Sequence, residues 1–286
     1  MFRFGPLESE KPGIVDGSGV LRDLSGIIDD WDSTTIADGT LLERIRKMDY
    51  SGLPKVAAGE RLGAPVVVTG KLICIGYNSK LHAKQMGEHL TEESEPVVFL
   101  KANSSVCGPN DPILHNRYTK KLDWEGELTV VVGKRGKYIY EGDAAGHIFG
   151  YMCGQDLSER YWQFDTNDKQ YTKGKSFDNF APLGPFLVTS EEVDDPSGLH
   201  AVLTVNGVIR QDFYTSDYIH SPAGIISYLS KFFTLYPGDV ILLGSPPGNA
   251  KSWGDNCWLK PGDRVEFEIS GLGKQSQAVI DEPESS

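Results

Sequence analysis

No apolar run in the sequence reaches about 18 residues, the length that a membrane-spanning helix needs. Cys-x-x-Cys pairs are also absent, and four widely spaced cysteines are typical of reduced thiols rather than of disulfides or a zinc site. The chain contains no GxGxxG or Walker sequence, so no dinucleotide or ATP site is indicated. Its first residues lack the basic and apolar regions of a signal peptide. We therefore expect a cytoplasmic protein that does not bind membranes.

Basic residues are scarce: 28 Lys and Arg stand against 40 Asp and Glu, which gives a formal net charge of −12. A nucleic-acid partner is therefore not expected, because binding to the phosphate backbone needs a basic face. The 39% of apolar residues is nevertheless enough for a real core. With 32 Gly and 16 Pro, many tight turns are expected, which favours a β-rich fold.

The length of 286 residues suits one large domain with a small appendage. We predict a β-rich α+β protein with a small N-terminal domain, residues 1–68, and a larger domain, residues 69–286. In the N-terminal domain, two short strands flank a turn at residues 16–19, and a helix covers residues 40–48. Apolar runs predict strands of the larger domain at residues 72–77, 96–102, 125–132 and 148–155.

Turn and cap residues predict further elements of the larger domain. The Asn-Gly pair at residues 206–207 is typical of a tight hairpin between two strands. Ser221, followed by a proline, predicts the start of a helix whose apolar side includes Phe232. Ser158 predicts an N-cap for a helix over residues 159–164, and a further short helix is expected at residues 79–87.

Three carboxylates form the first candidate site. Glu125 and Glu127 lie two residues apart in a strand-like segment, so their side chains point the same way. The residues that follow are apolar, so the segment should be buried, and buried paired carboxylates need a cation. Asp156 ends another predicted strand. Oxygen donors of this kind suit magnesium, manganese or calcium rather than zinc.

The alternative is that the glutamate pair lies on a solvated strand face, and the pattern alone favours neither interpretation. Glu266 and Glu268 form a second Glu-x-Glu pair that serves as an internal comparison. Their segment alternates regularly between polar and apolar residues, so these two side chains are expected to point to water. The segment after Glu127 has no such alternation.

Six stretches of the larger domain resemble, in this order, the fumarylacetoacetate hydrolase superfamily: EPVVFLKANSSVCGPNDPI, KLDWEGELTVVVG, GYMCGQDLSERYWQ, KGKSFDNFAPLGPFLVT, VNGVIRQDFYTSDYI and YPGDVILLGSPPG. The resemblance covers roughly residues 72–272. The segments GPNDPI and LDWEGEL, with the small N-terminal domain, look most like the branch of 2,4-diketo-3-deoxy sugar-acid hydrolases and ureidoglycolate lyase-like proteins. The family implies a mixed β-roll with few helices, a catalytic role for the larger domain, and a homodimer.

The resemblance also implies roles for single residues. Glu125, Glu127 and Asp156 match the family's three magnesium ligands. Lys175 matches the lysine that stabilises the developing enolate, and His82 matches the histidine that activates water.

Three further residues are expected to contact the substrate or a carboxylate. Gln163 matches a glutamine that contacts the substrate, and Ser245 stands where the family usually has a threonine near the substrate carboxylate. We interpret Arg160 as the anchor of a carboxylate, either that of Asp156 or that of the substrate.

The residue that normally partners the histidine is different in this chain. Gln85 replaces the family's glutamate. A carboxylate orients an imidazole and stabilises its protonated form, whereas a neutral amide can only orient it. Asp255 is the residue we name as a substitute partner of His82.

The resemblance implies a magnesium-dependent hydrolase that cleaves a carbon–carbon bond in a 2,4-diketo (acylpyruvate-type) acid through a metal-bound enolate. Gln85 keeps a second reading open, in which the same site serves a 2-oxo acid decarboxylase, lyase or tautomerase, because decarboxylation needs no activated water. A third reading is a protein that binds a 2-oxo acid without turning it over. In each reading the partner is a small-molecule 2-oxo acid.

Overall fold

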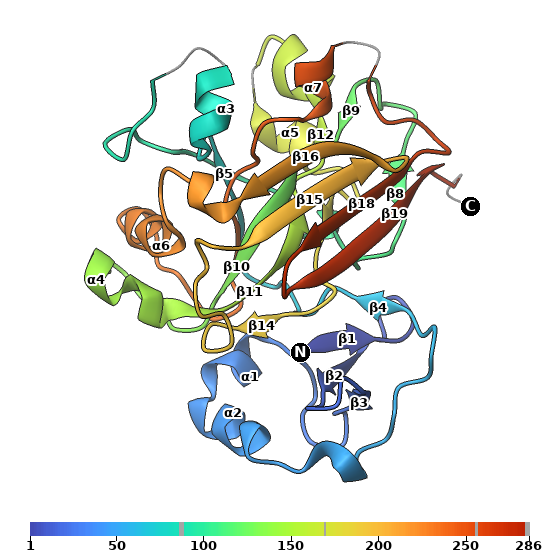
Figure 1. Ribbon diagram of the computed structural model, residues 1–286, viewed down its shortest axis with the longest axis vertical. Coiled ribbons are helices and arrows are strands. Elements are labelled where there is room, and N and C mark those ends of the chain that lie inside the picture. Colours follow the sequence, from blue (N-terminus) through green and yellow to red (C-terminus); the bar gives the residue numbers. More distant parts are fainter. Residues whose placement is uncertain (86–88, 169, 255–256, 284–286) are drawn as a thin grey trace.

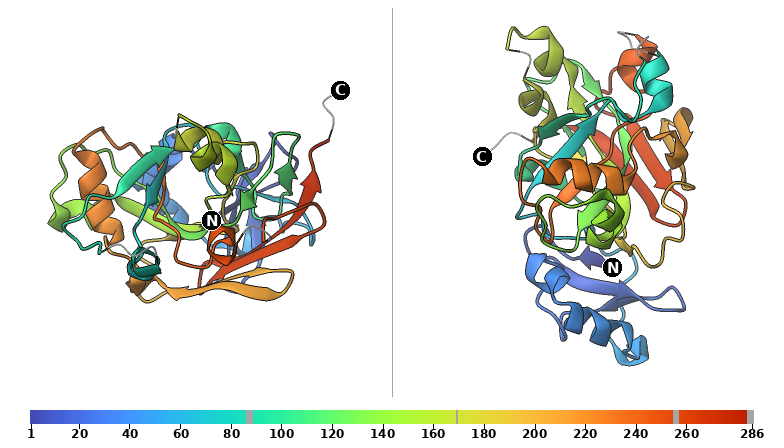
Figure 2. Two further views of the ribbon diagram at one scale, coloured as in Figure 1. Left: turned by 90° about the horizontal axis from the view of Figure 1, so that it is seen from above. Right: turned by 90° about the vertical axis from the view of Figure 1, so that its left-hand side faces the viewer.

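The computed structural model describes residues 1–85, 89–168, 170–254 and 257–283. A small N-terminal unit lies at one end of the molecule, and the rest of the chain forms a larger unit above it (Figure 1). The side view in Figure 2 shows the same arrangement of the two parts. The predicted β-rich α+β architecture with a small N-terminal sheet is confirmed, while the division at residue 68 stays a prediction.

The N-terminal unit is built on a four-stranded antiparallel sheet in the order β3-β2-β1-β4. The Asp16 carboxylate accepts hydrogen bonds from the N–H groups of Ser18 and Val20 (2.9 and 3.0 Å), which closes the predicted turn. Asp38 caps the predicted helix by accepting from the N–H of Leu41 at 3.0 Å. The elements are β1 (Phe2–Phe4), β2 (Lys11–Val15), β3 (Leu21–Asp23), α1 (Ser33–Ala37), α2 (Gly39–Arg46), the 3-10 helix η1 (Tyr50–Gly52) and β4 (Leu62–Gly63).

The first large sheet has six strands in the order β14-β11-β10-β17-β5-β6. Only β17 and β5 pair in parallel, and the other pairs are antiparallel. The four apolar runs are strands as predicted, although the strand expected at residues 96–102 is shorter. The strands are β5 (Leu72–Gly76), β6 (Val97–Leu100), β10 (Gly126–Val132), β11 (Ile148–Gln155), β14 (Val188–Thr189) and β17 (Val240–Leu242).

The second large sheet has five strands in the order β16-β15-β18-β19-β8. Asn206 and Gly207 join β15 to β16, with φ values of 52° and 76°, so the hairpin prediction is confirmed. In β18 the side chain of Glu268 is exposed between buried apolar neighbours, as the alternation predicted. The strands are β8 (Ile113–His115), β15 (His200–Val205), β16 (Val208–Tyr214), β18 (Arg264–Ile269) and β19 (Gly273–Asp281).

Short strand pairs and helices complete the larger unit. None of the helices in the described part of the chain is long and apolar enough to cross a bilayer. The remaining elements are β7 (Val106–Cys107), β9 (Leu122–Asp123), β12 (Ser158–Glu159), β13 (Ala181–Pro182), α3 (Lys80–Gln85), α4 (Glu141–Ala144), α5 (Tyr171–Lys175), α6 (Pro222–Ser230), α7 (Ala250–Trp253), the 3-10 helices η2 (Asn103–Ser105), η3 (Ala145–His147) and η5 (Thr215–Asp217), and the π-helix η4 (Tyr161–Asp165).

The core has two parts, one on each face of the six-stranded sheet. On one face, Leu128 and Val130 of β10 pack in a buried cluster with Phe267 of the five-stranded sheet. On the other face, Val131 of β10 belongs to a cluster that includes Trp31 of the N-terminal unit. The six-stranded sheet is therefore sandwiched between the second sheet and the N-terminal unit.

Two local predictions are wrong. Ser158 is no N-cap, because it lies in β12 and its hydroxyl donates to the carbonyl of Asp156 (2.9 Å). The turn that follows is a π-helix beginning at Tyr161, and it is the carboxylate of Glu159 that accepts from the N–H of Trp162 (3.0 Å). Phe232 lies beyond the end of α6 and is 59% exposed, so it is not part of that helix's apolar side.

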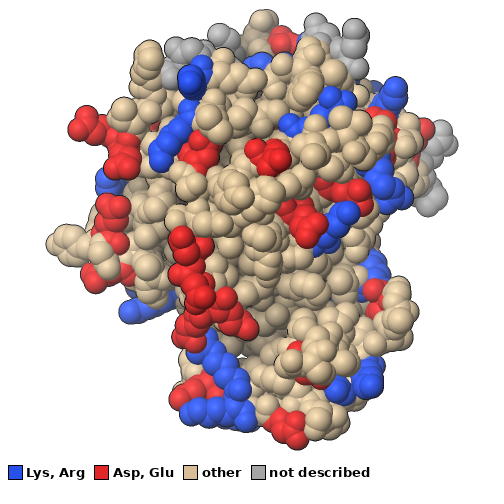
Figure 3. Space-filling view, in the orientation of Figure 1, with Lys and Arg blue, Asp and Glu red and all other residues tan. Residues whose placement is uncertain are grey.

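One other helix prediction is confirmed, and a second is tested only in part. Ser221 caps α6 as predicted, because its hydroxyl accepts from the N–H of Gly224 at 3.0 Å. The short helix expected at residues 79–87 exists as α3, and its expected end at Gly87 lies outside the described residues. On the face drawn in Figure 3, basic and acidic side chains are interspersed, and no continuous basic surface is seen there.

Candidate active site

The three candidate metal ligands come together at the ends of two paired strands. Glu127 lies in β10, Glu125 directly precedes that strand, and Asp156 directly follows β11. The antiparallel register places Gly126 opposite Gln155, and the N–H of Asp156 donates to the carbonyl of Glu125 at 2.9 Å. One carboxylate oxygen from each ligand lies within 4.8 Å of the others, and all three residues are buried. The solvated-face alternative is therefore wrong.

Two buried lysines hold the carboxylate of Asp156 between them. Lys101 Nζ lies 2.7 Å from Asp156 Oδ1, so Lys101 is a structural ion-pair partner. Lys175 Nζ lies 2.5 Å from Asp156 Oδ2 and 2.6 Å from Glu125 Oε2. Burial acts to lower the pKa of Lys175, but the charges of Asp156 and Glu125 outweigh it and hold that pKa above its ordinary value. Lys175 is therefore an ammonium group in the metal-free protein.

A glycine allows Lys175 to reach this position. A Cβ atom at Gly174 would lie 2.6 Å from the carbonyl oxygen of Glu159 and 2.7 Å from the nitrogen of Gln163. Real Cβ atoms do not approach backbone atoms so closely, so only glycine lets α5 pack against η4. The glycine before Lys175 is thus explained by the close packing of α5 against η4, which places the lysine beside the carboxylates.

Arg160 connects the carboxylates to Gln163. Its Nε donates to Asp123 (2.7 Å), one terminal nitrogen pairs with Glu125, and the other donates to Gln163 Oε1 (2.7 Å). The expected partner Asp156 is therefore replaced by Asp123 and Glu125. The amide nitrogen of Gln163 donates to no described residue, so its N–H groups can donate to a ligand.

Glu127 differs from the other two carboxylates. No ion pair to Glu127 is found among the described residues, and its Oε2 accepts from the N–H of Gly244 at 2.8 Å. Burial, together with the charges of Asp156 and Glu125, raises the pKa of Glu127 well above its usual range. A buried carboxylate that lacks a cation, next to two others, fits a hard divalent ion. The donor set of this chain therefore suits such an ion.

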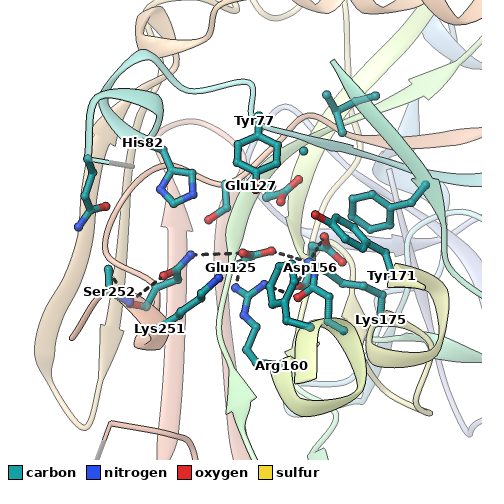
Figure 4. A pocket seen from close by; sticks show the side chains of 18 residues that line it. Tyr77, His82, Glu125, Glu127, Asp156, Arg160, Tyr171, Lys175, Lys251 and Ser252 are labelled. Carbon is teal, nitrogen blue, oxygen red and sulfur yellow. Dashed lines mark hydrogen bonds and ion pairs between the residues drawn. The ribbon is translucent and has the colours of Figure 1, made fainter. Parts of the chain in front are cut away.

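A cavity of about 300 Å³ opens directly onto the three carboxylates (Figure 4). It is lined by every residue that the sequence proposed for the site and that the structure describes: His82, Gln85, Glu125, Glu127, Asp156, Arg160, Gln163, Lys175 and Ser245. The Ser245 hydroxyl accepts from Gln211 Nε2 at 2.9 Å, which fixes its position in the wall. Asp255 lies outside the described residues.

His82 is carried by α3, whose first turn is fixed from outside the helix. The Ser79 hydroxyl accepts from the N–H of His82 (3.0 Å) and donates to Asp217. Asn78 anchors the same turn by donating to the carbonyl of Leu243 at 2.8 Å, at the end of β17. The start of α3 is thereby tied to the end of β17, which pairs with β10, the strand that carries Glu127.

The imidazole of His82 is poorly solvated. Its Nδ1 is buried and has no hydrogen-bond partner among the residues that the structure describes. Burial lowers the pKa of His82 below its ordinary value, and the charge of Glu125 opposes this shift. Gln85 lines the cavity one turn away, but it does not satisfy Nδ1. His82 is therefore held neutral near pH 7, as a base must be.

Sequence reasoning missed several residues that line the cavity. Tyr77 has a φ of 58° and stacks with the ring of His82, with centroids 6.4 Å apart. Tyr171 lies near Lys175, and burial raises its pKa to about 12. Asn249 and Lys251 come from the start of α7. No local pattern marks these four residues, because the fold brings them together from the end of β5, the start of α5 and the start of α7.

The roll of two mixed sheets and the buried carboxylates define a protein built to hold a divalent ion beside a small cavity. The family model described as "Fumarylacetoacetate (FAA) hydrolase C-terminal" matches residues 71–280. The chain therefore belongs to the fumarylacetoacetate hydrolase family. The narrower branch expected from the sequence stays a prediction.

Individual relatives carry different names. A Burkholderia cenocepacia protein named "Putative hydrolase" is 42% identical over 98% of this chain and 99% of its own length. The structure of 5-carboxymethyl-2-hydroxymuconate delta-isomerase from Mycobacterium smegmatis is 31% identical, covers 99% of both chains and has a TM-score of 0.77. Maleylpyruvate hydrolase from Sphingobium sp. SYK-6, in complex with manganese (II) ion and pyruvate, is 26% identical with a TM-score of 0.81, over 98% of this chain and 99% of its own.

Proposed function

We propose that the protein is a magnesium-dependent hydrolase that cleaves a carbon–carbon bond in a 2,4-diketo (acylpyruvate-type) acid. The observation that carries this proposal is the buried set Glu125, Glu127 and Asp156, which opens onto a cavity that also holds Lys175 and His82. The similar maleylpyruvate hydrolase, described in complex with manganese (II) ion and pyruvate, supports a 2-oxo acid as the ligand.

Glu125, Glu127 and Asp156 would hold the ion. When bound there, it would act as a Lewis acid that draws electron density from the substrate's oxo group. Manganese or calcium would bind the same oxygen ligands, so the choice of magnesium is a separate part of the proposal.

Lys175 and Gln163 would bind and orient the 2-oxo acid end of the substrate. Lys175 Nζ uses two short contacts on carboxylates, and its third contact, to the carbonyl of Asp156, is longer at 3.3 Å. A substrate oxygen can replace this weak contact, so that the ammonium group faces the negative charge that develops during cleavage. The N–H groups of Gln163, which donate to no described residue, would donate to the substrate carboxylate, and Ser245 would offer its hydroxyl from the cavity wall.

His82 would act as the base. It accepts a proton from water as the water oxygen adds to the carbonyl farther from the carboxylate. The carbon–carbon bond next to that carbonyl then breaks, and its electron pair passes to the 2-oxo acid fragment, which is protonated on carbon. The other fragment leaves as a carboxylic acid that contains the water oxygen.

The test is a panel of acylpyruvates with magnesium-loaded protein in water enriched in oxygen-18. We expect stoichiometric release of pyruvate and incorporation of one labelled oxygen into the acid fragment. Glu127→Gln serves as the control for a site that cannot hold the ion. Metal-loaded protein that releases no pyruvate from any acylpyruvate would refute the proposal.

The second candidate is a decarboxylase, lyase or tautomerase that uses the same site. It is favoured by the Nδ1 of His82, which has no partner among the described residues, and by Gln85 in place of a carboxylate, because these reactions need no activated water. The similar 5-carboxymethyl-2-hydroxymuconate delta-isomerase adds support. Release of carbon dioxide from oxaloacetate, or solvent deuterium exchange at C3 of a 2-oxo acid without cleavage, would identify it.

We also propose that the chain works as a homodimer. The exposed aromatic side chains of Tyr138, Tyr140 and Phe232 (71, 82 and 59% exposed) support burial of further surface in an assembly. Light scattering is expected to give twice the chain mass of 31.4 kDa.

A further inference from the structure

Lys251 is a cation at the cavity wall that no described residue neutralises. It lies in α7, and its backbone N–H donates to the carboxylate of Asp123 at 3.3 Å, which ties the helix to the metal site. Its Nζ stands 4.0 Å from the ring centroid of Phe164, so the side chain lies along the wall. Among the described residues, no carboxylate lies within ion-pair distance of this ammonium group.

Lys251 is an exposed residue, and the groups around its ammonium lower its pKa. Burial lowers the pKa of Lys251, and the positive charge of Arg160 lowers it further. The nearby negative charges of Asp123 and Glu125 are already shared with Arg160 through direct ion pairs, and that of Asp165 pairs with Lys121. An anion brought into the cavity would therefore meet an ammonium group that no described carboxylate pairs with.

The charges around the cavity indicate how many negative charges a ligand should carry. Three carboxylates line the cavity, Glu125, Glu127 and Asp156, and three cations line it as well, Arg160, Lys175 and Lys251, so these charges cancel. A divalent ion then leaves two excess positive charges. A dianionic ligand therefore balances the loaded site, whereas a monoanion leaves one positive charge without a counterion.

The two ends of such a ligand would bind at different ends of the cavity. In Figure 4, Lys251 and Ser252 lie at one end of the cavity, Tyr171 and Lys175 lie at the other, and Glu125 lies between them. A 2-oxo acid group held beside Lys175 would direct the rest of the molecule towards Lys251. The ring of Phe164 next to Lys251 offers an apolar wall for the connecting carbons.

We propose that Lys251 binds a second, distal carboxylate, so that the preferred substrates are dicarboxylic 2-oxo acids. The assignment rests on the proposed function, since it takes the metal end of the cavity as the place of the 2-oxo acid group. It adds a residue that sets specificity and a charge requirement that the metal ligands alone do not impose.

The experiment compares matched ligands that differ only in the distal group, by calorimetric titration of manganese-loaded protein. The pairs are 2-oxoglutarate against 2-oxopentanoate and 2-oxoadipate against 2-oxohexanoate. We expect the diacid of at least one pair to bind about tenfold more tightly, the scale of one charged hydrogen bond. Lys251→Met should remove this preference without weakening the monoacid, and Lys251→Arg should restore it.

Lys84→Met is the matched control, because Lys84 is exposed on α3 beside the cavity and its loss changes the net charge equally. It should keep the diacid preference, and manganese affinity should be unchanged in all variants. Equal binding of monoacid and diacid by the parent, or a preference that survives Lys251→Met, would overturn the assignment while leaving the 2-oxo acid site intact. Failure of all four ligands to bind would overturn the proposed function as well.

Discussion

Glu127→Gln and Asp156→Asn should have opposite effects on the stability of the metal-free protein, although each removes one carboxylate of the same site. Glu127 has no cation among the described residues, and it lies against two other carboxylates. Like charges about 4 Å apart repel by about 4 kcal/mol at an effective dielectric constant of about 20. An amide keeps the acceptor for the N–H of Gly244 and removes this repulsion.

Asp156 is in the reverse situation, because it is the counterion that Lys101 and Lys175 share. Removing one partner of a buried ion pair costs about 3–5 kcal/mol. We therefore expect Asp156→Asn to lower the melting temperature by about 10 °C. Glu127→Gln should instead raise the free energy of unfolding by about 1 kcal/mol or more, which raises the melting temperature by about 2–4 °C.

The dependence of stability on metal and on pH gives two further predictions. At a metal concentration about one hundred times the dissociation constant, the parent gains about 2.7 kcal/mol, and both variants should lose most of this gain. Because the pKa of Glu127 is raised in the folded state, the metal-free parent loses stability as pH rises above the ordinary glutamate value. The advantage of Glu127→Gln should therefore grow with pH.

The assay is thermal unfolding followed by circular dichroism, with chelator and with manganese, at several pH values. A Glu127→Gln protein that is destabilised in chelator as strongly as Asp156→Asn would refute the charge argument. If Glu127→Gln keeps the full rise in melting temperature that manganese gives the parent, Glu127 is not a metal ligand.

Three other substitutions test the residues around the ion. Lys101→Met should weaken metal affinity about 10- to 100-fold, because it removes the group that orients Asp156, and calorimetric titration of manganese measures this. Lys175→Met should lower kcat for acylpyruvate cleavage about 10²- to 10³-fold while manganese still binds; unchanged turnover would exclude the lysine from the reaction. For His82, the lowered pKa predicts that kcat/KM falls only below the ordinary histidine range, and Gln85→Glu should move this fall to higher pH and raise the hydrolytic rate. If decarboxylation of oxaloacetate changes in parallel with hydrolysis, Gln85 is not the missing partner.

The sequence predicted the elements whose signals are local. The Asn-Gly hairpin, the Ser221 cap and the apolar strands are encoded within a few neighbouring residues. The pattern around the carboxylate pair favoured neither a metal site nor a solvated face, and the structure decides between them, because β10 is buried along its whole length. The structure contributed the partner strand that brings Asp156 to the same place.

Other features depend on contacts that no local pattern encodes. The sequence suggested Ser158 as a helix N-cap, but Ser158 lies in strand β12. The carboxylate of Glu159 accepts from the N–H of Trp162 instead. No local pattern marks Lys101 as the partner of a metal ligand, because 55 residues separate it from Asp156. Lys251 carries no motif at all, and its importance rests on what the fold places beside it.

The face of the six-stranded sheet that carries Glu127 also carries Val131, because side chains an even number of residues apart share a face. At the Val131 end, the cluster with Trp31 and Ile45 of the N-terminal unit keeps that apolar surface out of water. Loss of the N-terminal unit would expose this surface. The N-terminal unit and the larger unit should therefore unfold as one cooperative unit. Manganese bound at the carboxylate end should then slow amide hydrogen exchange in the N-terminal sheet, which the ion never touches.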